Sequence, residues 1–234
     1  MSKPAMIELN EAIDMQPVLL SLKLASITVF ILLLICLPLS WWLAHTNARI
    51  KVLIQTITAL PLVLPPTVLG FYLLLMLGQQ GPLGRLWMNW FDESLAFSFK
   101  GLVVASVLYT MPFVLQPLQA TFSQIDLRSL EASWCMGASR IRSFFTIVLP
   151  QARVGLITAI VLGFAHTIGE FGVVLMVGGN IPAETQVISI AIYEQVETLN
   201  YQSAHLLSAG LLIFSFVVLC IVYSTNRRWQ MTFN

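Results

Sequence analysis

Long runs without an ionised residue alternate with short charged stretches along this chain. The runs cover residues 24–44, 52–84, 101–125 and 206–226, and a further run from 154 to about 177 contains a single glutamate. A helix that crosses a bilayer needs about 20 mostly apolar residues, so each run can supply one. The pattern therefore predicts an all-α integral membrane protein with five transmembrane helices, at about 18–44, 53–77, 101–121, 152–177 and 206–226.

The composition supports a membrane protein over other classes. Of the 234 residues 57% are hydrophobic and 10% charged, whereas a soluble domain carries about 25% charged residues. The apolar content excludes a disordered chain, and a net charge of +1 excludes a nucleic-acid binder that relies on a basic face. The three cysteines are scattered and form no Cys-x-x-Cys pair, so they indicate neither a disulfide framework nor a metal site. We expect one membrane domain over residues 1–234.

The placement of lysine and arginine predicts the orientation of the spans. Eight basic and two acidic residues lie in the first and third loops between predicted spans and at the C-terminus. Four basic and eight acidic residues lie in the N-terminal segment and the other two loops. Because loops rich in Lys and Arg face the cytoplasm, the N-terminus is expected outside and the C-terminus inside.

The third of these loops, residues 126–150, begins with an amphipathic helix. Asp126 can accept a hydrogen bond from the first turn and so cap the helix. Leu127, Leu130 and Trp134 follow at spacings that place them on one face. Gly137 interrupts the pattern and can adopt the positive φ that a turn requires. We expect a helix followed by a turn at the cytoplasmic surface.

A second amphipathic helix is predicted in the same loop. Its apolar face is expected to consist of Ile141, Phe144, Phe145 and Val148, and Pro150 is expected to end it. The charged side chains of the loop are left for a partner: Arg128, Glu131, Arg140 and Arg142.

This loop resembles the "EAA" loop of bacterial binding-protein-dependent ABC importer permeases. That motif is Glu-Ala-Ala, three residues, Gly, nine residues and Ile-x-Leu-Pro, and the spacing matches from Glu131 to Pro150, with Ser133 in place of the second alanine. The resemblance implies a coupling helix, between the third and fourth spans, that docks on a cytoplasmic ATPase subunit. Its implied residues are Leu130, Glu131, Ala132, Ser133, Trp134, Gly137, Arg140, Leu149 and Pro150.

Other stretches are similar to the molybdate permease subunits of the same family. Two of them are residues 17–23 and residues 60–71, which contain two adjacent prolines. The other two are residues 168–172, with the sequence Ile-Gly-Glu-Phe-Gly, and residues 180–185, with the sequence Asn-Ile-Pro-Ala-Glu-Thr. Sulfate and thiosulfate permeases share the Gly-Glu-Phe-Gly element, so sulfate/thiosulfate transport stays open as an alternative. Tungstate also stays open, because molybdate and tungstate are tetrahedral dianions of nearly equal size.

The resemblance implies the permease subunit of an ATP-driven importer with the type I ABC importer permease fold. Such a subunit carries an oxyanion from a periplasmic or lipid-anchored binding protein into the cytoplasm by alternating access. It implies a homodimer with two ABC ATPase subunits in the bacterial inner membrane. The chain lacks a Walker A motif, so it is not expected to be an enzyme, and ATP and Mg²⁺ are expected on the ATPase. No cofactor is expected on this chain.

Two groups of residues are candidates for the translocation path or its gate. Pro61, Pro65 and Pro66 each remove a backbone donor from the second span. Irregular backbone at membrane depth is tolerated only where protein or a water-filled cavity surrounds it. Three prolines within six residues therefore favour a pathway or hinge over a packing kink.

The second group is Gly169, Glu170 and Gly172 in the fourth span. Glu170 is the sole acidic residue inside a predicted span, and such residues are usually functional. A carboxylate repels an oxyanion, so direct substrate binding is excluded and a gate or a structural role is left. His166 precedes Glu170 by one helical turn, and we expect a mutual hydrogen bond rather than a proton relay.

Two other classes of function are compatible with parts of the pattern. An ion-coupled secondary transporter would use the His166 and Glu170 pair, and a membrane scaffold would bind a partner through the loop without transport. No Lys or Arg lies deep in a predicted span except Lys23, near the outer end of the first. A high-affinity oxyanion site needs cations or many N–H donors, so selectivity is expected on the external binding protein.

Overall fold

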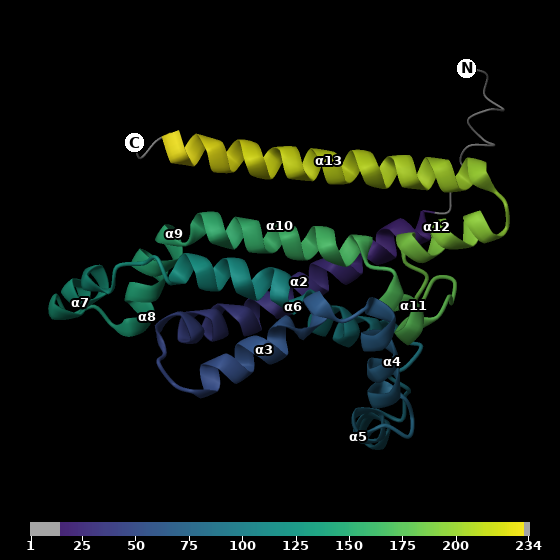
Figure 1. The fold of residues 1–234 in the computed structure, drawn as a ribbon, viewed down its shortest axis with the longest axis horizontal. Helices are drawn as coiled ribbons and strands as arrows, with labels where there is room; N and C mark the ends of the chain where they lie inside the picture. The colour runs from purple at the N-terminus through teal and green to yellow at the C-terminus, as the bar shows by residue number, and fades with distance from the viewer. Residues whose placement is uncertain (1–14, 232–234) are drawn as a thin grey trace.

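The computed structural model describes residues 15–231, and within that range the chain is built of helices and the loops that join them. The long helices α2 (Gln16–His45), α6 (Phe99–Phe122) and α10 (Arg153–Gly169) lie side by side at the centre (Figure 1). Helix α13 (Tyr201–Met231) runs along the outside of α10. The helices of the 126–150 loop project at one end of the molecule, the same end at which α13 finishes, and α11 and α12 lie at the other.

Close packing of small residues brings α10 against α6. A Cβ atom on Gly155 would lie 1.9 Å from Thr121 Oγ1, and one on Gly163 would lie 2.6 Å from Val114 Cγ2. Glycine permits this close approach at both crossings, because a Cβ atom would overlap with the Thr121 or Val114 side chain unless that side chain or the helix moved. The core that results runs along α2, α6 and α10 and includes Leu32, Cys36, Leu118 and Phe122.

Some of the predicted spans are bent rather than straight. Among the described residues, Gln16–His45, Phe99–Phe122 and Tyr201–Cys220 are long and apolar enough to cross a membrane as single helices. Helix α3 (Ile50–Val63) and α4 (Pro66–Leu77) form a pair bent by 116°. Residues Arg140–Gln151 and α10 form another, bent by 74°. The described chain thus supplies three candidate spans, or up to five if each bent pair is one span.

Neither of the predicted spans 53–77 and 152–177 is one continuous helix. The first breaks at Leu64 and Pro65, because consecutive prolines withhold two backbone donors and force the residue before each out of the helical region. The second breaks at Glu170, whose backbone is extended with φ −70° and ψ 131°, before α11 (Gly172–Gly178) begins.

Two short helices complete the end of the molecule opposite the 126–150 loop. Helix α5 (Pro82–Phe91) follows a glycine-rich turn, and α12 (Ile188–Glu197) precedes α13. The Ile188 N–H donates a hydrogen bond of 2.8 Å to Ser21 Oγ, so α12 is tied to the first turns of α2.

Candidate functional site

The first helix of the loop has the predicted cap and turn. Helix α7 (Leu127–Cys135) begins after Asp126, whose Oδ1 accepts a hydrogen bond of 3.0 Å from the Arg128 N–H. Gly137 has φ +86° and no atom near its missing Cβ, so the turn selects glycine for its backbone conformation and not for space. Ser139 then caps the short helix α8 (Arg140–Ser143) through a hydrogen bond from the Arg142 N–H.

The two sides of α7 differ in what they can contact. Leu130 is 2% exposed and lies in the central core, so it anchors the helix to the bundle. Trp134 is 42% exposed, and the Arg140 guanidinium lies 5.7 Å from its ring centroid. Of the three residues expected on one apolar face, Leu127 and Trp134 are therefore exposed and Leu130 alone is buried; Glu131 is also exposed.

Ser133, the departure from the motif, joins the two helices of the loop from inside. It is buried, and its Oγ lies 2.7 Å from Ser143 Oγ and donates to the Leu130 carbonyl at 2.8 Å. Ser143 Oγ also lies 3.1 Å from the Ser139 carbonyl oxygen, and because a hydroxyl has one hydrogen it donates either to that oxygen or to Ser133 Oγ. The hydroxyl at this position thus links α7 to α8 rather than facing a partner.

The second helix of the loop departs from the prediction in two ways. Ile141 and Phe145 are exposed while Phe144 and Val148 face the core, so the expected four-residue apolar face is wrong. The helix also contains a π-helical turn, η1 (Phe144–Val148), and it ends with α9 (Leu149–Gln151), one residue after Pro150. The Leu149 N–H bonds to the Phe144 carbonyl, five residues back, and this wider turn accommodates the proline ring that follows.

The two helix breaks meet at the other candidate site. A Cβ atom on Gly172 would lie 2.8 Å from Pro66 Cβ, so the start of α11 touches the start of α4. One turn further, a Cβ on Gly70 would lie 2.8 Å from Met176 Cβ. The half-helices α4 and α11 thus pack through glycine along their length. Tertiary structure brings together Pro66 and Gly172, which the sequence placed in separate spans.

Other predicted residues of this group lie around the meeting point. Pro61 lies inside α3, before the bend, and Pro65 is extended at the bend itself. Gly169 ends α10, and a Cβ atom added to it would meet no atom within 4 Å. Only Gly172 of the two glycines is therefore required by close packing.

Glu170 is enclosed at the break. Its side chain is 3% exposed, and within residues 15–231 neither carboxylate oxygen has a hydrogen-bond partner. The Ser106 hydroxyl approaches it without reaching hydrogen-bond geometry. Ser189 on α12 donates to the Glu170 backbone carbonyl, which becomes free because α10 has ended. This hydrogen bond from α12 holds the helix break in place, and the Glu170 carboxyl group stays buried.

The predicted hydrogen bond between His166 and Glu170 is not formed. His166 Nε2 has no partner among the described residues, and its ring stacks on Phe113 at a centroid distance of 3.8 Å. The prediction assumed a continuous helix, in which residues four apart share a face. Because α10 ends at Gly169 and Glu170 is extended, that relation does not hold here.

The sequence of this chain matches one family of known proteins. Residues 36–230 match the family "binding-protein-dependent transport system inner membrane component". The chain belongs to this family. It is therefore a multi-pass protein of the inner membrane and a transport component. The loop of α7 and α8 lies within the matched residues, as do both helix breaks.

Curated relatives of this permease include molybdenum and sulfate transport proteins. It is 51% identical over 214 residues to the molybdenum transport system permease protein ModB of Azotobacter vinelandii, covering 92% of this chain and 95% of that one. It is 36% identical to the ModB of Escherichia coli K12, covering 92% and 93%. The sulfate transport system permease protein CysT of Synechocystis is 30% identical, covering 81% and 66%.

Solved structures show that the permease has the fold of ABC importers. A bacterial ABC transporter that imports the acidic polysaccharide alginate matches with a TM-score of 0.69 at 17% identity, covering 94% of this chain and 80% of that chain. The methionine ABC transporter MetNI, in inward-facing conformations, matches with a TM-score of 0.69 at 19% identity, covering 97% and 99%. The expected ABC importer permease fold is confirmed.

The permease also has a polar groove that the sequence reasoning missed. A groove of about 350 Å³ between α3 and the second half of α6 is lined by polar side chains that include Gln55, Thr58, Gln116, Gln119 and Ser123. The signal was present: each helix carries polar residues three apart inside an otherwise apolar run. Polar side chains at membrane depth usually face protein or water rather than lipid.

Proposed function

We propose that this chain is the membrane-spanning subunit of an ATP-driven importer that carries molybdate into the cytoplasm by alternating access. The observation that carries the proposal is the 51% identity, over nearly the full length of both chains, to a molybdenum transport permease. Sulfate permeases match at lower identity and over a smaller share of each chain. The chain has no ATPase motif, so a separate subunit supplies ATP hydrolysis and holds ATP and Mg²⁺.

The proposed topology is five spans in a single type I permease domain over 1–234, with each bent pair counted as one span. The N-terminus is outside and the C-terminus is cytoplasmic. The charge distribution supports this, and so does the position of the 126–150 loop at the same end of the molecule as the end of α13 (Figure 1). The first described residues of α2 and the whole of α12 lie at the opposite end.

The topology can be tested with a native thiol. Cys135 ends α7 and is exposed, whereas Cys36 is buried. In a Cys220→Ser background, a membrane-impermeant maleimide should label Cys135 in inside-out vesicles and not in intact spheroplasts. Cys135→Ser is the control. Labelling from the outside would reverse the proposed orientation.

The exposed face of α7 is the proposed ATPase-docking surface. Glu131 and Trp134 of α7 supply a carboxylate and an aromatic ring, and Arg140 at the start of α8 places its guanidinium over that ring. Leu130 anchors α7 in the central core, and the Ser133–Ser143 contact ties α7 to α8. Because α7 and α8 connect α6 to α10, a displacement of the loop by two closing ATPase subunits moves both central helices.

The proposed path lies between two copies of the chain. Helices α3 and α4 expose apolar residues such as Val63 and Tyr72, and the polar groove opens beside them. A two-fold axis along this face would enclose neutral amide and hydroxyl donors that suit weak passage of an oxyanion. The touching breaks of α4 and α11 form the proposed gate on the outer side. There, a periplasmic or lipid-anchored binding protein delivers the substrate.

Transport assays decide the function. The permease and its ATPase partner are reconstituted in proteoliposomes with the binding protein, and radioactive molybdate uptake is measured with unlabelled molybdate, tungstate or sulfate in competition. We expect ATP-dependent uptake that sulfate does not inhibit at equal concentration. Efficient competition by sulfate would reassign the substrate. Uptake that persists without ATP and collapses with the proton gradient would favour a secondary transporter.

A further inference from the structure

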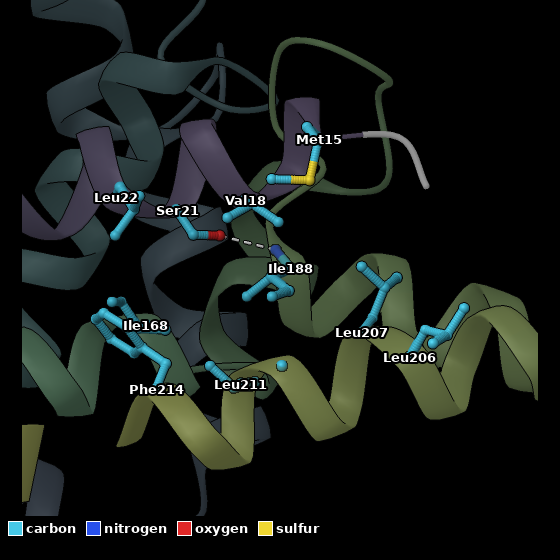
Figure 2. Close-up of a pocket in the computed structure, with 11 residues that line it drawn as sticks. Met15, Val18, Ser21, Leu22, Ile168, Ile188, Leu206, Leu207, Leu211 and Phe214 are labelled. Carbon is cyan, nitrogen blue, oxygen red and sulfur yellow. Dashed lines mark hydrogen bonds between the residues drawn. The ribbon is translucent and has the colours of Figure 1, made fainter. Parts of the chain in front are cut away.

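An elongated apolar cavity lies between the outer ends of α2 and α13. Its volume is about 300 Å³, and Figure 2 shows side chains from both helices pointing into it, with Ile168 and Ile188 closing the space between them. The lining runs from Met15 to Leu22 on α2 and from Leu206 to Phe214 on α13. Both stretches span about two helical turns, roughly 10–12 Å at the rise of an α-helix. The cavity is thus parallel to the helix axes.

The cavity offers no polar group to a ligand. Ser21 is the one polar side chain in its lining, and both of its hydrogen-bonding functions are in use. Its Oγ donates to the Pro17 carbonyl at 2.8 Å. It also accepts from the Ile188 N–H at 2.8 Å (Figure 2). Empty apolar cavities stay free of water, because a buried water needs two to four polar partners. The occupant must therefore be apolar.

The surroundings of the cavity identify that occupant. Gln16–His45 and Tyr201–Cys220 both have the length and hydropathy of membrane spans, so the opening between them faces lipid hydrocarbon. Only 6% of the apolar window of α13 is buried inside the chain, so this helix makes few protein contacts of its own. We propose that the cavity binds one acyl chain of a phospholipid of the outer leaflet, as a wedge between α2 and α13.

The depth and direction of the cavity fit an acyl chain. Its outer end lies by the first turns of α2 and α13, where the exposed Tyr201 is placed to sit at headgroup level. Its inner end is closed by Phe214, which packs against Phe164 at a centroid distance of 6.4 Å. The long axis runs across the membrane, which is also the direction of lipid chains. Apolar contact alone accounts for the binding, so it does not depend on the headgroup.

The bound chain also contacts the segment that holds the helix break. Ile168 lies two residues before Glu170, and Ile188 precedes the serine that donates to the Glu170 carbonyl. The acyl chain therefore packs against both segments that the hydrogen bond between Ser189 and Glu170 joins. It also gives α13 apolar contacts that the rest of the protein does not provide. This proposal concerns the membrane-embedded surface and does not depend on which oxyanion is transported.

Gly210 provides a direct test, because it lines the cavity and no atom lies within 4 Å of its missing Cβ. Gly210→Phe should fill the cavity without a backbone clash. The matched control is Leu212→Phe, which places the same ring on the exposed side of α13. The full-length protein with its ATPase partner is reconstituted in vesicles of phosphatidylethanolamine and phosphatidylglycerol that contain a phospholipid with a photoreactive diazirine in its acyl chain. Labelled residues are located by peptide mass spectrometry.

We expect wild-type labelling at Leu22, Ile188 and Leu211 to exceed that at the exposed Ile213. Gly210→Phe should lower it several-fold, and Leu212→Phe should leave it unchanged. If Gly210→Phe does not assemble in the membrane, Gly210→Leu makes the same comparison with a smaller side chain. Cavity labelling no stronger than at Ile213, or labelling unaffected by filling the cavity, overturns the proposal. So does a cross-link from these residues to a second copy of the chain, because the partner would then occupy the space.

Discussion

Substitution of Gly172 by alanine tests whether the two helix breaks are packed as one unit. The added Cβ would lie 2.8 Å from Pro66 Cβ and 3.7 Å from the Pro66 carbonyl carbon. Carbon atoms that are not bonded prefer about 3.5–4.0 Å, and a proline ring cannot rotate away from the overlap. Relief therefore requires α4 and α11 to separate where they begin.

The magnitude follows from the cost of overpacking. An extra methyl group in a closely packed site costs about 1–3 kcal/mol. If the overlap exists only while the breaks touch, it shifts the equilibrium away from that state by about 5- to 150-fold. We expect slower ATP-driven molybdate uptake and a thermal unfolding midpoint lowered by several degrees for the purified complex.

Gly169→Ala is the matched control, three residues away in the same motif. Gly169 also lacks a positive φ, but its Cβ would meet no atom within 4 Å. We expect unchanged uptake and stability equal to or slightly above that of the original chain, since alanine restricts the unfolded state. If the Gly172 and Gly169 variants behaved alike in both measurements, the contact between the breaks would have no functional weight and the reasoning would be refuted.

Further predictions concern the core, the buried acid and the 126–150 loop. Gly163→Ala places a Cβ 2.6 Å from Val114 Cγ2 and should lower the unfolding midpoint of the bundle. Adding Val114→Ala should restore most of that midpoint, because it removes the atom that the new Cβ meets. If the midpoint did not recover, the close crossing of α6 and α10 would be contradicted. Glu170→Gln keeps the shape of a buried, unpartnered carboxyl group and removes its capacity to ionise, so stability should be equal or higher and uptake retained. Loss of uptake at unchanged stability would show that the carboxyl group takes part in transport. Leu130→Ala should cost about 2–5 kcal/mol of folding stability through a core cavity, whereas Trp134→Ala should keep the unfolding midpoint and reduce coupled ATP hydrolysis. A normal hydrolysis rate in the Trp134 variant would exclude it from the docking surface.

Local spacing explains which features of the loop were predictable. Asp126 as a cap and Gly137 as a turn each depend on a few neighbouring residues, and both are found. The inward and outward faces of α7 were harder to predict, because Leu130 and Trp134 are similarly apolar. Only the position of the core decides that Leu130 is buried and Trp134 is exposed. The π-turn before Pro150 could not be predicted either, because the pattern of apolar residues assumes a regular α-helix.

The sequence by itself determined that this is a charge-poor membrane protein, where its apolar segments lie and which loop resembles the EAA motif, since these depend on composition and short-range order. Tertiary structure decided where the apolar segments bend and which bends meet. Pro66 and Gly172 are more than a hundred positions apart, and no periodicity relates them, yet their contact defines the proposed gate. The acyl-chain cavity has the same origin, because α2 and α13 enclose it only once the chain between them has folded.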